Sequence, residues 1–315
     1  MLAAYTVIVT VILIVTWPCG TILNSSIIAV YLSDWKKGVK CGECDQITLS
    51  MGCNYLLIQC FIIIFWAFRF YGLDLPFAEK LSFAINTGFW FSVSLSFWLT
   101  ADLSICYCLR LVNLSSALFN QIKRRLSRIV TPLLLWSVGI SFIFPVTRIF
   151  AIQIDQNETF INLENTSNVN LGIVIPAVAF NVCLPFIITS ICIFLSLISL
   201  LRHIRRMKQN PQFGSPQLKN HIGACRTMFL LMALNFIFFL IICSSMLISD
   251  RIGTIWDIVV LLGEMLNPSC QAVVLIFGNS KLLGAWIDLV SSVMEQCTKI
   301  IVPYIYCDKE HYIEK

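Results

Sequence analysis

The sequence predicts an all-α membrane protein, built as a seven-transmembrane-helix bundle with a C-terminal amphipathic surface helix. Three observations carry this prediction. The 315 residues are 58% hydrophobic and only 12% charged, whereas soluble domains carry about 25% charged residues. The mean hydropathy is +0.83. Long uncharged runs recur along the chain, each sufficient to cross about 30 Å of hydrocarbon as a helix.

The expected spans follow from the distances between charged residues. Six uncharged runs and one interrupted run cover residues 2–33, 46–68, 81–101, 129–147, 165–201, 227–249 and 252–280. The first run is too long for a signal peptide and lacks a preceding basic segment, so we keep it as a span. The chain therefore crosses the membrane seven times, which places its two ends on opposite sides.

The distribution of Lys and Arg predicts the orientation. Of the 22 basic residues, 18 lie in one set of connecting segments and 4 in the other. The positive-inside rule puts the richer set in the cytoplasm, with the N-terminus outside the plasma membrane and the C-terminus cytoplasmic. Sequons at Asn157 and Asn165 fall in a predicted outer loop and are predicted glycosylation sites.

The C-terminal region predicts a separate surface element. Residues 1–283 are expected to form the transmembrane domain, and residues 284–315 a cytoplasmic tail. From Leu282 to Cys297 apolar residues recur at three- and four-residue spacing, the pattern of an amphipathic helix lying on the inner leaflet. Cys41 and Cys44 form a lone Cys-x-x-Cys pair without a second pair nearby, so neither a metal site nor a cofactor is predicted.

Motifs at the inner ends of the spans narrow the class of protein. The third span ends in LSICYCLRLVNLS, Leu103–Ser115, which resembles the Leu-Ser-x-x-Tyr-x-Leu-Lys-Ile-Ala-Asn-Phe-Ser signature of the bitter taste receptors, the type 2 taste receptor family. The seventh span ends in LIFGNSKL, Leu275–Leu282, similar to the family's Leu-Ile-x-Gly-Asn-x-Lys-Leu. Gly20 and Asn24 resemble the family's first-span residues. These matches occur in the family's order along the chain.

The resemblance implies a G-protein-coupled receptor rather than an enzyme. Its expected ligands are small organic bitter compounds bound between the outer halves of the helices, and its expected partner is a gustducin-like heterotrimeric G protein. The type 1 vomeronasal receptors share the architecture and remain an alternative. A small-molecule transporter is a weaker alternative, because no internal repeat is visible.

Two departures from the family pattern fall inside the membrane. The family's Leu-Ala-x-Ser-Arg reads Met51–Tyr55 here, so Tyr55 replaces an arginine. The family's Pro-Ser-x-His reads Pro268–Gln271, so Gln271 replaces a histidine. The resting-state contacts of this chain are therefore expected to differ from those of the family.

The outer third of the third span is the main predicted ligand-binding surface. Phe89, Val93 and Phe97 recur at helical spacing, with Ser96 beside them and Trp90 on the flank. Such a face suits flat, amphipathic ligands. The alternative is that these aromatic residues serve only packing or the membrane interface. In the family alignment Val93 replaces an asparagine, which removes a polar contact.

The seventh span supplies a second predicted surface. Asp257, Leu261 and Glu264 lie on one stripe of the helix. A carboxylate in a membrane span needs water or a polar partner, so this stripe should line the bundle interior. Glu264 either binds a ligand cation or supports a polar neighbour. Asn181 in the fifth span completes the predicted ligand-binding set.

The inner ends of the spans carry the predicted coupling residues. Asp102, deeper in the third span, is expected to be a buried, hydrogen-bonded acid that helps set the resting state. Arg110 stands at the family's lysine position, near the expected docking face for a G protein. The predicted coupling residues are Tyr107, Arg110, His203, Arg206 and His221.

Overall fold

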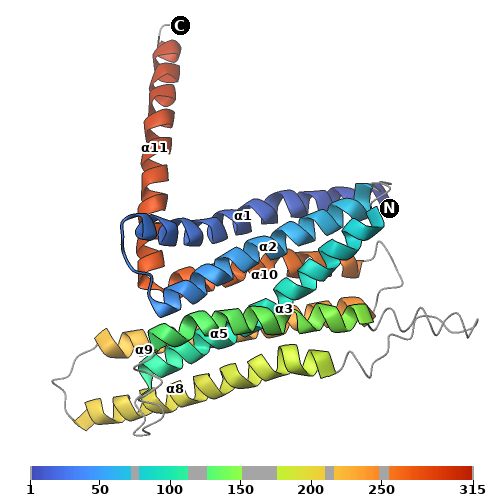
Figure 1. The fold of residues 1–315 in the computed structure, drawn as a ribbon. Helices are drawn as coiled ribbons and strands as arrows, with labels where there is room; N and C mark the ends of the chain where they lie inside the picture. Colours follow the sequence, from blue (N-terminus) through green and yellow to red (C-terminus); the bar gives the residue numbers. More distant parts are fainter. Residues whose placement is uncertain are drawn as a thin grey trace, which may run out of the picture.

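The computed structural model describes residues 2–71, 78–112, 126–150, 176–209, 216–247 and 255–313. Nearly all of these residues form helices, and they contain no strand (Figure 1). In chain order the elements are α1 (Leu2–Lys36), α2 (Glu43–Tyr71), α3 (Ala78–Leu111), α5 (Leu126–Ser141), the π-helical η1 (Ala179–Cys183), α8 (Leu184–Gln209), α9 (Pro216–Leu247), α10 (Ile255–Gly278) and α11 (Ser280–Ile313).

The prediction of seven membrane-spanning helices is confirmed. Within the described ranges, seven helical segments are long and apolar enough to cross a membrane. Most helices extend beyond the uncharged runs that predicted them; α3, for example, continues through Asp102 to Leu111. Charged residues therefore end the apolar runs without ending the helices.

Successive helices run in opposite directions, which gives the bundle two distinct ends (Figure 1). At the N-terminal end α1 and α3 begin. At the opposite end, called the α11 end below, α11 leaves the bundle across the direction of the other helices. The central helix is α3, which packs against α2, α5, α8 and α9. In the most apolar stretch of α3, 89% of the residues are buried, compared with 17% in that of α1. Residues on α3 are therefore well placed to link the two ends.

Two prolines interrupt regular helical geometry. The α5 helix ends at Ser141, and helical structure resumes over 143–150 after a turn at Phe142. Pro145 lacks the amide hydrogen that would bond to the carbonyl of Ser141, which accounts for the break. Pro185 likewise cannot bond to the carbonyl of Asn181, and the chain widens into η1 just before it.

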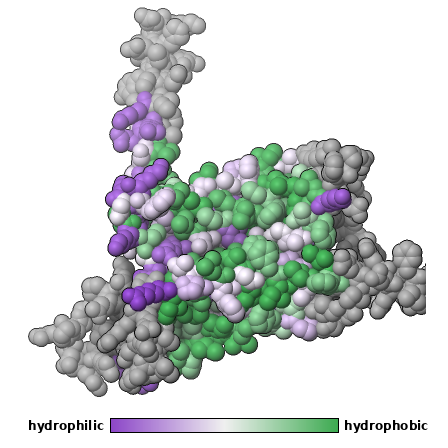
Figure 2. All heavy atoms as spheres, viewed as in Figure 1, coloured by the Kyte–Doolittle hydropathy of each residue, from purple (hydrophilic) through white to green (hydrophobic). Residues whose placement is uncertain are grey.

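The outer surface of the bundle is suited to lipid. Figure 2 shows hydrophobic residues over most of the visible bundle surface, with hydrophilic residues gathered near the end from which α11 leaves. Large apolar side chains point outward from several helices, among them Ile14, Trp136 and Phe194. So much exposed apolar surface would be unfavourable in water, which supports the membrane prediction.

The predicted C-terminal helix is also confirmed. The α11 helix spans Ser280–Ile313 as one element. Leu282 is buried and Trp286 is partly buried against the core, whereas Ile287, Val293 and Met294 farther along are exposed. The first turns of α11 are therefore anchored to the bundle, and the rest projects sideways from it (Figure 1).

Candidate functional site

The predicted aromatic face of α3 lies in one buried cluster towards the N-terminal end of the bundle. Trp90, Val93 and Phe97 supply the α3 side. Three other segments supply the remaining apolar side chains. We call the whole set the aromatic cluster: Trp90, Val93, Phe97, Phe144, Ala177, Phe238 and Ile242. Phe89 is partly buried and packs against it. The structure thus brings together four of the five residues predicted on this face.

Trp90 is the most heavily contacted ring of this cluster. Phe89 meets it edge-on at 5.7 Å between ring centres, and Phe144 lies 5.3 Å away at a tilt. The guanidinium carbon of Arg148 lies 4.3 Å from the centre of the Trp90 ring. A tryptophan face attracts a cation through its quadrupole, so this contact combines aromatic surface with positive charge.

The polar residues of this region are arranged differently from the sequence prediction. Ser96 is fully buried and donates to the carbonyl of Val93 within its own helix. Ser94 instead donates a 2.8 Å hydrogen bond to the side-chain oxygen of Asn181. Asn181 donates its amide hydrogen to the carbonyl of Ala177. Sequence reasoning missed Ser94, because only the rotation of α3 against η1 shows which serine faces the neighbour.

Of the residues predicted on α10, Leu261 belongs to a neighbouring cluster, and Glu264 contacts Trp66, a member of that cluster. Leu261 is fully buried in the larger core, which confirms that this stripe faces the interior. Glu264 is half-buried and accepts a hydrogen bond of 3.4 Å from the indole nitrogen of Trp66 on α2. Phe89 packs against both this core and the aromatic cluster. The described ligand residues predicted on α3 and α10 therefore form two adjoining groups that meet at Phe89.

A buried hydrogen-bond chain joins three helices in the middle of the bundle. The Asn235 amide on α9 donates 2.7 Å to the hydroxyl of Thr100 on α3, and the Gln271 amide on α10 donates 2.7 Å to the Asn235 oxygen. Gln271 also reaches the oxygen of Asn267 at 3.4 Å. Gln271 is one of the two departures from the family pattern, and here its side chain hydrogen-bonds α10 to α9.

Asp102 lies as the sequence predicted. It is 1% exposed, and its carboxylate accepts a 2.7 Å hydrogen bond from the hydroxyl of Ser137 on α5. A buried acid needs such a partner. Asp102 therefore ties α3 to α5.

Arg110 is paired at the α11 end. Its guanidinium donates to the carboxylate of Glu43 at the start of α2 in an ion pair, and its side chain keeps 46% of its surface exposed. Tyr107, one turn earlier, is partly buried against Cys225 and Met228 of α9. Arg110 and Tyr107 thus connect α3 with α2 and α9 at the end where the basic residues gather.

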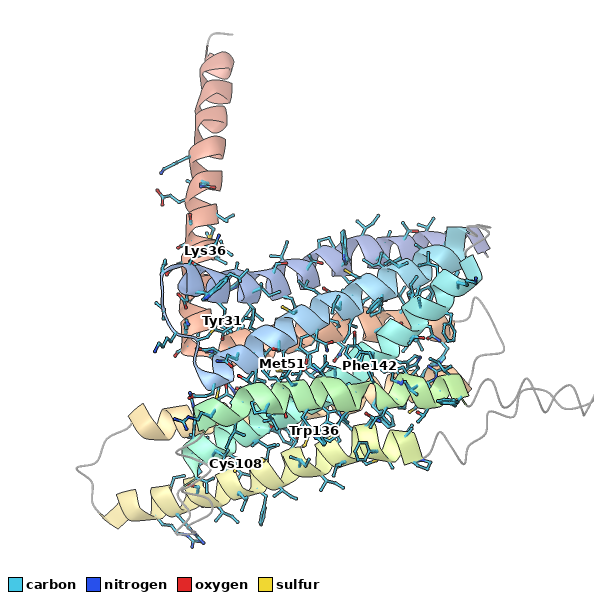
Figure 3. All side chains as sticks on the ribbon, viewed as in Figure 1. Tyr31, Lys36, Met51, Cys108, Trp136 and Phe142 are labelled. Carbon is cyan, nitrogen blue, oxygen red and sulfur yellow. The ribbon has the colours of Figure 1, made fainter. Side chains whose placement is uncertain are left out.

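Sequence reasoning treated Asn279 and Lys281 only as motif residues, but they form a further contact set at this end. The Asn279 amide donates 3.1 Å to the hydroxyl of Tyr31, which lies with Lys36 near the end of α1 (Figure 3). The ammonium of Lys281 lies 2.5 Å from Asp34 and 3.8 Å from Asp45. Desolvation lowers the pKa of Lys281, but the hydrogen bond to Asp34 and the charge of Asp45 outweigh it, so the pKa is raised.

The thiols near this end pair across helices. Cys44 of α2 lies 2.7 Å from Cys106 of α3, sulfur to sulfur, and both are buried. Cys41, the other member of the Cys-x-x-Cys motif, is separate and half-buried. Among the described residues, no three His, Cys, Asp or Glu side chains gather as they would to hold a metal ion.

A cavity of about 310 Å³ lies between α1, α10 and the start of α11. Its walls are mainly apolar, with Ile27, Val30, Leu282 and Trp286 among the lining residues. It lies at the opposite end of the bundle from the aromatic cluster and touches none of the predicted ligand residues. We therefore place the candidate site at the aromatic cluster, where aromatic surface, charge and hydrogen-bonding groups converge.

Several predicted residues lie outside the part of the chain that the structure describes. They are the glycosylation sites Asn157 and Asn165 and the side chains of His203, Arg206, His221 and Asp257. Their predicted roles stay predictions.

Comparison with known proteins supplies independent information. The family model described as "Taste receptor protein (TAS2R)" matches residues 1–294. Taste receptor type 2 member 9 of Macaca mulatta is 28% identical over 294 residues, covering 84% of this chain and 88% of that protein. Taste receptor type 2 member 14 of Gorilla gorilla gorilla is 29% identical over 288 residues, covering 88% and 89%. Taste receptor type 2 member 124 of Rattus norvegicus is 26% identical over 283 residues, covering 87% and 90%.

Proposed function

Because this chain belongs to the taste receptor type 2 family, we propose that it binds small organic bitter compounds at the aromatic cluster and activates a gustducin-like heterotrimeric G protein. The family match favours this function over the vomeronasal and transporter alternatives. The single structural observation that carries the proposal is the position of the aromatic cluster. It is built on α3, the buried central helix, whose other end carries Arg110.

The proposed ligand contacts divide by chemistry. Phe89, Trp90 and Phe97 offer ring faces and edges for stacking, and Val93 offers an apolar wall. Asn181 and Glu264 supply polar groups towards the neighbouring helices. The full proposed set is Phe89, Trp90, Val93, Ser96, Phe97, Asn181, Asp257, Leu261 and Glu264.

The route from ligand to G protein is proposed to run through α3. A ligand activates a receptor only if it binds one conformation of the bundle more tightly than another. Thr100 and Asp102 connect α3 to α9 and α5 between the aromatic cluster and Arg110. A ligand that shifts α3 would therefore alter these hydrogen bonds and the ion pair at the α11 end.

The proposed docking surface for the G protein lies at the α11 end. Exposed Arg110 and half-buried Tyr107 occupy the end of α3, and basic residues of α8 and α9 follow in sequence. We propose that Tyr107, Arg110, His203, Arg206 and His221 form this surface. The matching orientation has the N-terminus outside the plasma membrane, residues 284–315 in the cytoplasm and glycans at Asn157 and Asn165, as the charge distribution favours.

A calcium assay in cells carrying a chimeric G protein tests the ligand site. Bitter compounds and volatile pheromone-like compounds are screened side by side, and active compounds are tested on Trp90→Ala. Potency should fall about two- to tenfold for aromatic agonists, since an aromatic pair contributes about 0.5–1.5 kcal/mol. Trp136→Ala is the control, because Trp136 is 67% exposed on α5. Equal losses in both variants would argue against the proposed site.

A further inference from the structure

A narrow cleft lies beside the aromatic cluster, between the first turns of α3 and residues 143–150. Asn86, Thr87 and Trp90 line one wall, and Pro145 and Arg148 line the other. The cavity has a volume of about 10 Å³, which is room for roughly one water molecule. The cleft can therefore admit one small polar group, but not a whole organic ligand.

Arg148 brings an incompletely balanced positive charge to this cleft. Its guanidinium carbon lies 4.3 Å from the centre of the Trp90 ring, so the ring face compensates part of the charge. Its Nη1 atom is buried and has no hydrogen-bond partner within the described residues. A guanidinium presents its N–H donors in a planar fork that matches a carboxylate. An acidic group entering the cleft would satisfy a donor that is otherwise costly to bury.

We infer that this cleft binds the acidic group of aromatic anions, with one oxygen of a carboxylate or sulfonate in the cleft at Arg148 and the aromatic body along the aromatic cluster. Trp90 belongs to both the cleft and the cluster, so one ligand can reach the two together. This inference rests on the proposed function, because it specifies the ligand class of the same site.

The position of Glu264 supports a preference for anions. Glu264 accepts a hydrogen bond from Trp66 and lies on α10, whereas Arg148 lies directly against Trp90. Among the described residues, the charged side chain that lies against Trp90 is therefore a cation. A ligand anion meets an opposite charge there, and a ligand cation meets a like charge.

A phosphate of the outer membrane surface is the other anion that Arg148 could meet. Trp90 is only 9% exposed and packs with Phe144 in the bundle. An anion that also contacts this ring must approach along the aromatic cluster. That geometry favours a flat small molecule over a lipid headgroup.

The test uses two photoreactive probes of the same shape. 4-Benzoylbenzoate carries a carboxylate, and 4-benzoylbenzamide replaces it with a neutral amide. The full-length receptor is placed in phosphatidylcholine nanodiscs, illuminated with each probe, and the labelled peptides are identified by mass spectrometry. The acid should reach half-maximal labelling at about a tenfold lower concentration than the amide, as expected for a charge-assisted hydrogen bond.

Variants assign that preference to Arg148. Arg148→Gln should remove the advantage of the acid while leaving labelling by the amide, which also reports that the site is folded. Lys80→Gln removes the same charge from an exposed position at the same end of the bundle, and it should keep the wild-type preference. Should Arg148→Gln fail to express, Arg148→Lys is used in its place. The inference is then decided by the preference of the wild-type receptor for the acid over the amide, together with label on residues 83–90 or 145–149.

The outcomes separate this inference from the proposed function. Equal labelling by acid and amide, or an acid preference that survives Arg148→Gln, overturns the inference while the proposed ligand site stands. Saturable labelling by neither probe overturns both. An acid preference that appears in phosphate-free maltoside detergent but not in nanodiscs assigns Arg148 to lipid phosphate and overturns the inference as well.

Discussion

The side-chain amide of Gln271 donates a 2.7 Å hydrogen bond to the side-chain oxygen of Asn235 and so joins α10 to α9 in the middle of the bundle. Both side chains are buried, at 0% and 2% exposure. Asn235 passes the connection on to Thr100 of α3. The departure from the family pattern at Gln271 is therefore matched by specific partners on other helices.

Gln271→Leu should destabilise the bundle, because it leaves the oxygen of Asn235 buried without its donor. The expected loss is about 1–2 kcal/mol, in the range of interhelical hydrogen bonds in membranes and of buried unsatisfied acceptors. The measurement is the thermal unfolding midpoint in detergent. Cys270→Leu, at an exposed position of the same helix, is the control. An unfolding midpoint that falls no further in Gln271→Leu than in the control would contradict the prediction.

Glu264→Gln keeps the shape of the side chain and removes its charge. If Glu264 contacts ligand, cationic agonists should lose about tenfold or more in potency, as a charge-assisted hydrogen bond of roughly 1.5–3 kcal/mol implies, and neutral agonists should change little. Trp66→Phe removes the indole donor to Glu264 and keeps a smaller aromatic ring in its place. If both variants weaken agonists of every charge alike, Glu264 supports the bundle and does not bind ligand.

Arg110→Ala should reduce agonist-driven G-protein activation with little change in surface level, because Arg110 ends α3 at the proposed docking face. Glu43→Gln breaks the same ion pair but leaves the arginine in place. It should retain signalling. The measurement is nucleotide exchange by the G protein at matched receptor density. If Glu43→Gln reduces exchange as strongly, the ion pair matters and a direct contact of Arg110 with the G protein is not required.

Glycosidase treatment should shift the mobility of the protein on a gel, and the double variant Asn157→Gln with Asn165→Gln should abolish the shift. The reason is that both sequons fall in a loop predicted outside. An N-terminal epitope should be accessible on intact cells, and a C-terminal epitope only after permeabilisation. A double variant that is still shifted by glycosidase would contradict the predicted glycosylation sites. A C-terminal epitope detected on intact cells would contradict the predicted orientation.

The predicted α3 face shows where sequence reasoning succeeded and where it stopped. The helical spacing of Phe89, Val93 and Phe97 places them on one side of a helix in any fold, and they do lie together. The same pattern could not show that Ser94, rather than Ser96, would reach Asn181. That choice depends on how α3 is rotated against η1, whose wide turn comes from Pro185.

The α11 end gives a second case. The Cys-x-x-Cys motif carried no prediction of a contact for Cys44, and the thiol that it meets is Cys106, on another helix. Lys281 was visible only as part of a motif, and its partner Asp34 lies at the other end of the chain. Arg148 was counted among the outer basic residues, and nothing in its sequence context pointed to Trp90.

The sequence by itself determined the number of membrane helices, their order, the α11 helix and the burial of Asp102, because transfer of a segment into lipid depends on that segment's own hydropathy and backbone hydrogen bonds. Only the tertiary structure decided which side chains meet: Glu264 with Trp66, Gln271 with Asn235 and Arg148 with Trp90. These pairs depend on the rotation and depth of each helix. Both are set by packing among residues distant in the chain, which no single segment encodes.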